Sequence, residues 1–216
     1  MVSTAPQSQA IAPPASEIQF LGEEVAADYD TARVVILPIP YEATTSYRQG
    51  CEQGPAALLA ASQQVEFYDG EVDRETWPVG IWTHRAIADT AAQPALSSEA
   101  MLTETRETVA RLIRDGKFVV ALGGEHSISA GVVDAYREAS SESFTVVQID
   151  AHSDLRHSYE DSIYNHACVM RRVVDMGLPT LQVGIRSLCS EEAQLIRETD
   201  RSEEHTSELQ SPDHLV

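Results

Sequence analysis

Residues 117–154, KFVVALGGEHSISAGVVDAYREASSESFTVVQIDAHSD, decide the fold of this chain. Two short apolar runs, 117–122 and 144–149, flank a segment with helical character at 127–139. A strand, a crossover helix and a second strand form the unit from which parallel sheets are built. Neither run alternates between polar and apolar residues, so each strand is expected to be buried on both faces. The stretch therefore predicts a parallel sheet covered by helices.

The rest of the chain repeats this alternation in both directions. The helix predicted at 97–116 is the clearest, because Ser97 or Ser98 can cap its start and Gly116 can end it. Alternating strands and helices predict an α/β protein with a mainly parallel sheet and helices on both faces. The other predicted strands are 33–40, 77–83 and 181–185, and the other predicted helices are 55–68, 166–177 and 190–200.

Length and composition fit one ordinary domain. The 216 residues are 43% hydrophobic and 23% charged, which is typical of globular proteins. No apolar run approaches the roughly 18 residues of a membrane-spanning helix, and the N-terminus has no signal-peptide pattern. Residues 1–17, rich in Ala, Pro, Ser and Gln, are expected to form a flexible arm before a domain at 18–200. Three cysteines without a C-x-x-C motif favour a reducing cytoplasm.

The charge balance restricts the possible partners. The chain has 15 basic and 34 acidic residues, a net charge of -19. Nucleic acids and membranes are not expected partners, because phosphate binding needs a basic patch and no membrane segment is present. A small cationic ligand would be attracted to such a surface. Most of these charges also have a simpler role, because acidic surfaces keep proteins soluble.

Polar side chains follow the two strands of the opening stretch directly. Gly123-Gly124-Glu125-His126-Ser127 follows the first strand and Asp150-Ala151-His152-Ser153-Asp154 follows the second. Ligands of open α/β sheets bind beyond the carboxyl ends of the strands, so His126, Asp150, His152 and Asp154 should converge there. Imidazole and carboxylate ligands without cysteine suit Mn²⁺, Fe²⁺ or Zn²⁺, and the oxygen-rich set leans toward Mn²⁺. The alternative is that these residues only make turn and cap hydrogen bonds.

Other catalytic patterns fit less well. The glycine turn lacks the lysine and the spacing of a phosphate-binding loop, and no G-x-S-x-G nucleophile elbow is present. Cys168 lies on a predicted helix and is expected to be a buried thiol. His84 and His157 have no partner cluster and are expected to be ordinary surface or loop histidines.

Four motifs in this order resemble the ureohydrolase family, which includes arginases and agmatinases. The glycine turn at 123–127 and the D-A-H-x-D motif at 150–154 match the family. The segment at 40–50, PYEATTSYRQG, and the segment at 183–187, VGIRS, resemble the agmatinase branch in particular. The resemblance covers about residues 18–200 and implies a three-layer α/β/α fold with a mainly parallel sheet, of the arginase type.

The resemblance also implies a site and a reaction. It implies two Mn²⁺ ions, with Asp150 bridging both, His126 and Asp154 on one ion and His152 on the other, and His166 as a proton-shuttling histidine. A hydroxide that bridges the ions would attack a guanidino carbon, and agmatine and water would give putrescine and urea. The expected partner is thus a small cationic guanidino compound, and the full-length protein is expected to be a homo-oligomer.

One residue departs from the arginase pattern. Arginases have an asparagine where this chain has Arg156, which favours a substrate without the amino-acid carboxylate, with agmatine first. Guanidinobutyrate and guanidinopropionate stay open, because Arg156 could meet a carboxylate. A ureohydrolase-fold protein that binds a partner without catalysis is the alternative from another functional class.

The last sixteen residues, RSEEHTSELQSPDHLV at 201–216, read like a translated sequencing adapter. We therefore expect the natural reading frame to be interrupted at about Asp200 and the tail to be disordered. A later family motif, S-x-D-x-D-x-x-D-P, supplies two metal-bridging aspartates and does not occur in this chain. The fold is expected to be incomplete at its C-terminus, and the fragment by itself is expected to be inactive.

Overall fold

The computed structural model describes residues 12–199 and the backbone of 203–204. The strands are β1 (Val34–Ile39), β2 (Tyr68–Asp69), β3 (Arg74–Glu75), β4 (Ile81–Thr83), β5 (Phe118–Gly123), β6 (Val146–Ile149), β7 (Thr180–Val183) and β8 (Glu203–Glu204). The α-helices are α1 (Gly54–Ser62), α2 (Ser98–Arg114), α3 (Ile128–Ala139), α4 (Val169–Asp175) and α5 (Ser190–Thr199). Three single turns of 3₁₀ helix are η1 (Cys51–Gln53), η2 (Trp77–Val79) and η3 (His166–Cys168).

The parallel strands form two groups of three. In the first group β1 pairs with β4 on one side and β5 on the other, so Val34 lies opposite Ile81 and Phe118. In the second group β7 lies between β6 and β8. All four of these pairings are parallel, which confirms the predicted α/β class with a mainly parallel sheet.

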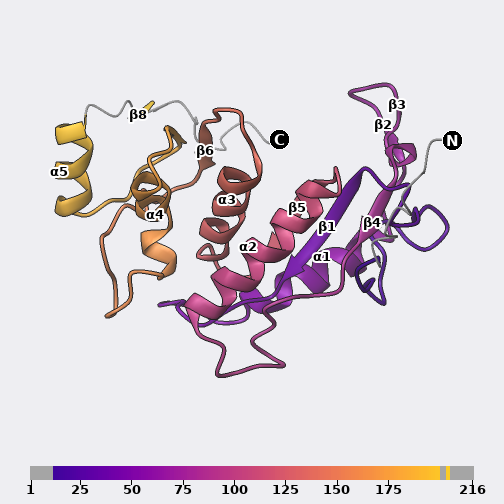
Figure 1. Cartoon of the computed structure of the whole chain (residues 1–216), viewed down its shortest axis with the longest axis horizontal. Coiled ribbons are helices and arrows are strands. Elements are labelled where there is room, and N and C mark those ends of the chain that lie inside the picture. Colours follow the sequence, from indigo (N-terminus) through magenta and orange to yellow (C-terminus); the bar gives the residue numbers. More distant parts are fainter. Residues whose placement is uncertain (1–11, 200–202, 205–216) are drawn as a thin grey trace, which may run out of the picture.

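Helix α2 covers the first group of strands and packs on α3 (Figure 1). Its apolar side chains repeat at helical spacing, and Met101, Val109 and Leu112 are fully buried against β1 and β5. Each such side chain stabilises the fold by roughly 1.5–3 kcal/mol. Ser97 caps the helix, because its hydroxyl accepts a hydrogen bond from Ala100 N at 3.2 Å. The clearest predicted helix is therefore confirmed, including its cap.

Helix α3 joins two hydrophobic cores. Its Ile128 and Ala135 belong to the core of the first strand group, whereas its Ala130 packs with Val169 and Val173 of α4 in a second core. Figure 1 shows α3 between α2 and α4, and both neighbours contact it. The residues that follow β5 and β6 are thereby brought toward each other.

The two strand groups do not pair with each other among the described residues. The outer edges of β5 and β6 instead border a cavity of about 560 Å³, which α3 and α4 also line. Phe118 on β5 and Val147 and Ile149 on β6 are 65%, 57% and 83% exposed. Strand β8 pairs with the outer edge of β7, so the open apolar edges among the described residues are those of β5 and β6. The predicted disordered tail thus has two residues in a strand, and 201–202 and 205–216 lie outside the described residues.

Two predicted elements differ from the structure in their extent. The helix predicted at 55–68 ends at Ser62, and Tyr68–Asp69 instead pairs with Arg74–Glu75 in an antiparallel hairpin. The strand predicted at 77–83 is divided by Gly80, whose φ of +82° ends η2 before β4 begins. A glycine is required there, because other residues rarely adopt this conformation.

The described part of the predicted flexible arm lies against β4. Ser16 N donates to Thr83 O at 2.9 Å and Arg85 N donates to Pro14 O at 3.0 Å, so this part is held in place. His84, predicted as a surface or loop histidine, is buried beside it, and burial lowers the pKa of its imidazole. Within 12–199, none of the helices has the length and apolar character needed to cross a membrane.

Candidate metal centre and active site

The turn after β5 depends on a close backbone approach. Gly124 N donates to Ile39 O at 3.0 Å and Glu125 N donates to Tyr41 O at 2.9 Å. A Cβ atom on Gly124 would lie 2.2 Å from Tyr41 O, so only glycine fits. The two hydrogen bonds tie the turn to the end of β1 and project His126 beyond the sheet.

The turn after β6 is held by one hydrogen bond within the turn and by two from the start of α4. Asp150 Oδ1 accepts from His152 N at 2.9 Å, as in an Asx turn. Asp154 O accepts from Met170 N and Arg171 N at 3.0 and 3.1 Å, which satisfies free N–H groups at the start of α4. Asp154 itself has a φ of +49°, so its backbone bends away from the strand direction.

His126, Asp150 and Asp154 meet where these two turns converge. His126 Nδ1 lies 2.9 Å from Asp154 Oδ2 and 3.6 Å from Asp150 Oδ2. One ligand atom from each of the three residues lies within 4.8 Å of the other two. An imidazole nitrogen beside two carboxylates is a donor set that fits a divalent cation, whose charge would offset the repulsion between the carboxylates. The predicted convergence is observed for these three residues.

His152, predicted as a fourth ligand, lies outside this cluster. Its Nδ1 is 3.5 Å from Asp150 Oδ1, and 65% of its side chain is exposed. Asp150 Oδ1 accepts from the backbone N–H of His152, and the His152 side chain lines the pocket without joining the cluster. His152 therefore stays a predicted ligand, and the structure places it beside Asp150 only.

A pair of buried glutamines lies beneath the cluster. Gln148 Nε2 donates to Asp154 Oδ2 at 3.3 Å and to His152 O at 3.2 Å. Gln182 Nε2 donates to Gln148 Oε1 and, at 2.7 Å, to Ser153 O. Such outer partners orient the ligands of metal sites. We did not predict them, although a glutamine inside an otherwise apolar strand is a signal of this role.

Glu192 fixes the same turn from α5. Its Oε1 accepts from Leu155 N at 2.9 Å and its Oε2 accepts from Cys189 N at 2.6 Å, the residue before the helix. Burial by itself raises the pKa of this carboxyl, but the backbone hydrogen bonds from Cys189 and Leu155 outweigh it, so the pKa lies below its ordinary value. A glutamate three residues into a helix that binds back to the cap is a recognisable sequence pattern, which we did not use.

His166, the predicted proton shuttle, begins η3 and lines the same pocket as the cluster. Asn165 caps η3, because its Oδ1 accepts from Ala167 N at 3.0 Å. The ring of His166 meets the ring of Tyr159 edge to face, with centroids 6.1 Å apart. Cys168 is buried, as predicted, and burial raises the pKa of its thiol.

The pocket around these groups has a volume of about 560 Å³. Its wall includes the loop of Thr45 to Arg48 and also Arg156, whose guanidinium lies 5.0 Å from the centroid of the Tyr159 ring. His126, Asp150, Asp154 and His166 thus share one cavity with two arginines. This cavity is large enough for a small organic substrate.

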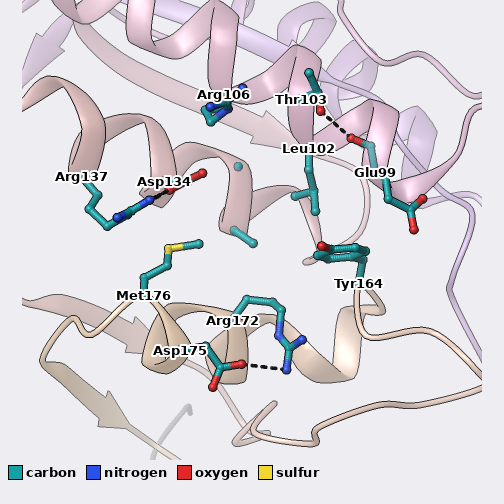
Figure 2. A pocket seen from close by; sticks show the side chains of 12 residues that line it. Glu99, Leu102, Thr103, Arg106, Asp134, Arg137, Tyr164, Arg172, Asp175 and Met176 are labelled. Carbon is teal, nitrogen blue, oxygen red and sulfur yellow. Dashed lines mark hydrogen bonds and ion pairs between the residues drawn. The ribbon is translucent and has the colours of Figure 1, made fainter.

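A second pocket lies between α2, α3 and α4 (Figure 2). Its arginines are paired with acids: Arg106 with Glu138, Arg137 with Asp134 and Arg172 with Asp175, at 3.3, 2.7 and 3.0 Å. The lining side chains shown in Figure 2 include none of the clustered ligands. This pocket therefore offers little unpaired charge to a ligand.

Residues 32–210 match the family model described as Arginase family. The chain belongs to the arginase family. The match extends past residue 200, so the boundary between 18–200 and 201–216 stays a prediction. Membership confirms the resemblance to ureohydrolases that the glycine turn and the D-A-H-x-D motif indicated.

Several relatives of this arginase-family chain have specific names. The N(1)-aminopropylagmatine ureohydrolase of Synechocystis sp. is 56% identical over 181 residues, which are 83% of this chain and 59% of that protein. The agmatinase of Pyrococcus horikoshii is 35% identical over 167 residues, 76% of this chain and 56% of that protein. The crystal structure of the agmatine ureohydrolase of Thermoplasma volcanium matches with a TM-score of 0.73 and 31% identity, covering 83% of this chain and 58% of that one. The chain spans somewhat under three fifths of the length of these relatives.

Proposed function

We propose that the protein hydrolyses the guanidino group of an agmatine-type amine and releases urea. The observation that carries the proposal is the cluster of His126, Asp150 and Asp154, which shares a pocket with His166. A cation site and a titratable imidazole in one cavity are the groups that hydrolysis of a poorly electrophilic guanidinium requires.

The cluster would hold manganese. His126, Asp150 and Asp154 offer one nitrogen and two carboxylate ligands, with His152 beside them as a further ligand, and the oxygen-rich set favours Mn²⁺ among the first-row metals. Divalent ions bound there would lower the pKa of a coordinated water and polarise the guanidino group. A pair of ions needs further ligands, which we expect from the part of the relatives' length that this chain does not match.

His166 would move the proton that the reaction requires. Water adds its oxygen to the guanidino carbon, the bond from this carbon to the substituted nitrogen breaks, and the oxygen leaves in urea. The departing nitrogen takes up a proton to leave as an amine. An imidazole can supply that proton near neutral pH. The position of His166 in the pocket wall supports this role.

We propose N(1)-aminopropylagmatine as the preferred substrate and agmatine as the second. The name of the 56% identical relative supports this order, and the net charge of -19 favours a polycation. A guanidino acid such as guanidinobutyrate is the other candidate, because Arg48 and Arg156 line the pocket and could bind a carboxylate. The free thiols Cys51, Cys168 and Cys189 support a reducing, cytoplasmic setting.

The test compares urea release from three substrates: N(1)-aminopropylagmatine, agmatine and guanidinobutyrate. It uses the chain extended to the length of its relatives, with added Mn²⁺, and the 216-residue chain beside it. We expect kcat/KM to fall in the order given for the extended chain and no activity for the shorter one. Mn²⁺ binding without urea release by the extended chain would favour a non-catalytic binding protein instead. Light scattering on the extended chain tests the expected homo-oligomer.

A further inference from the structure

Glu125, in the turn between the glycines and His126, is a buried carboxylate surrounded by donors. It is only 4% exposed. Its Oε2 accepts from Ala43 N and Thr44 N at 2.8 and 2.7 Å. Its Oε1 accepts from the hydroxyls of Thr44 and Ser127, both at 2.5 Å. Four donors surround this side chain and match the acceptor positions that its two oxygens offer.

Thr44 connects Glu125 to His166 through hydrogen bonds. A hydroxyl has a single proton, and Thr44 donates its proton to Glu125. Toward any other group Thr44 Oγ1 can therefore act only as an acceptor. It accepts from the backbone N–H of His166 at 3.0 Å, and His166 Nδ1 lies 3.4 Å away. A neutral imidazole can fill that second contact only when Nδ1 bears the proton.

We propose that Glu125, acting through Thr44, holds neutral His166 in the tautomer with its proton on Nδ1, leaving Nε2 as the basic nitrogen. Glu125 and Thr44 are positioning residues, because neither is argued to touch the substrate. The tautomer follows from hydrogen bonds within the chain and does not depend on a bound metal. Its catalytic value rests on the proposed function, in which His166 exchanges a proton with the reaction.

A purely structural role for Glu125 predicts a different outcome. The carboxylate also anchors residues 43 and 44 to the turn after β5, so its loss could loosen this loop without changing the imidazole. In Glu125→Gln, the amide oxygen can keep the two backbone donors while its NH₂ group faces Thr44. The Thr44 proton is then released from the carboxylate and can be donated to His166 Nδ1. The proposal therefore predicts a reversed tautomer, which a structural role does not.

The experiment is NMR of the 216-residue chain with ¹⁵N-labelled histidine at pH about 9, where an ordinary imidazole is neutral. Two-bond ¹H–¹⁵N correlations identify the protonated nitrogen, and His166→Gln assigns the signal. We expect Nδ1–H in the wild type and in Thr44→Ser, and Nε2–H in Glu125→Gln. Thr44→Val should lose the preference for Nδ1–H. Thr45→Val is the matched control, because Thr45 Oγ1 bonds Glu42 at 3.2 Å and should leave the signal unchanged.

An Nε2–H tautomer in the wild type would overturn the proposal, and so would an unchanged Nδ1–H tautomer in folded Glu125→Gln. If Glu125→Gln does not fold by circular dichroism, the contrast between Thr44→Ser and Thr44→Val decides. In the extended chain, Thr44→Val should lower kcat by about tenfold with KM nearly unchanged, and Thr44→Ser should restore it. If Thr44→Val changes the tautomer but keeps a normal kcat, the tautomer assignment stands. The proposed role of His166 in proton transfer would then be contradicted.

Discussion

His126 Nδ1 lies 2.9 Å from Asp154 Oδ2, although the two residues follow strands of different sheets. The contact exists because α3 spans both hydrophobic cores and brings the turn after β5 to the turn after β6. A cation bound between these two side chains would therefore have ligands from both halves of the molecule.

Removing one carboxylate from the cluster should weaken metal binding. In Asp154→Asn the side chain keeps its shape but loses its charge. Loss of a residue that only hydrogen-bonds to a metal ligand typically lowers metal affinity by about tenfold or more. We therefore expect Asp154→Asn to lower the affinity for Mn²⁺ by more than about tenfold. Titration of free Mn²⁺ followed by electron paramagnetic resonance measures the affinity. Asp134→Asn is the control, because Asp134 pairs with Arg137 outside the cluster. Equal affinities in the two variants would refute the ligand role of Asp154.

His166→Ala should separate catalysis from metal binding. In the extended chain we expect Mn²⁺ content to be unchanged and urea release to fall by about 10²- to 10⁴-fold, the usual contribution of a positioned acid or base. His157→Ala is the control, because His157 is an exposed histidine that does not line the pocket. Loss of Mn²⁺ from His166→Ala would show that this residue is a ligand and not a proton shuttle.

Gly124→Ala tests the close approach between the turn after β5 and Tyr41. The new Cβ would lie 2.2 Å from a backbone oxygen that cannot move aside, so we expect the free energy of unfolding to fall by about 3 kcal/mol. Gly70→Ala should change it by less than about 0.5 kcal/mol, because nothing lies within 4 Å of the added atom. Urea unfolding of both variants measures the difference. A similar, small effect at both positions would contradict the close packing at Gly124.

Glu192 should make stability depend on pH. Its pKa is below the ordinary value of 4.5, so the ionised side chain stabilises the fold above that pH, and this contribution is lost as the pH falls through the lowered pKa. Glu192→Gln should therefore lower the free energy of unfolding by roughly 1–2 kcal/mol at pH 7, and the difference should shrink below pH 4.5. Glu191→Gln, an exposed neighbour, should show neither effect. A deficit of Glu192→Gln that is constant with pH would contradict this explanation.

The open edges of β5 and β6 should make the 216-residue chain associate with itself. Ile149→Lys places a charge on the most exposed apolar side chain of these edges, so we expect less aggregate by light scattering. Val72→Lys, at an exposed site near the hairpin of β2 and β3, should change aggregation less. Equal effects of the two substitutions would point to general charge repulsion.

Most of the secondary structure could be predicted from local pattern. The cap at Ser97 and the glycine turn at 123–127 are defined by residues within a few positions of each other, so sequence periodicity and capping rules suffice. The separation of the parallel strands into two groups could not be predicted, because pairing between strands depends on residues distant in sequence. The β2–β3 hairpin was missed because each strand has only two residues, too few to show an alternation.

The part of the candidate site that follows directly from the order of strands and motifs in the chain could be predicted. His126, Asp150 and Asp154 converge because each follows a parallel strand, and the motif spacing alone indicates this. The exposed position of His152 depends on side-chain direction within a turn, which spacing does not determine. The hydrogen bond from His166 N to Thr44 Oγ1 also was not predictable, because the two residues are 122 positions apart.

The junction between the two cores gives the site a thermodynamic role in folding. Any cation held by both His126 and Asp154 binds only when the two halves are together, so it stabilises their association by RT ln(1 + [L]/Kd). At a concentration of one hundred times Kd this is about 2.7 kcal/mol. Amides of β6 and α4 should then exchange with solvent more slowly when Mn²⁺ is added, because opening at the junction would require release of the ion. Unfolding of the chain should therefore become more cooperative as the metal site fills.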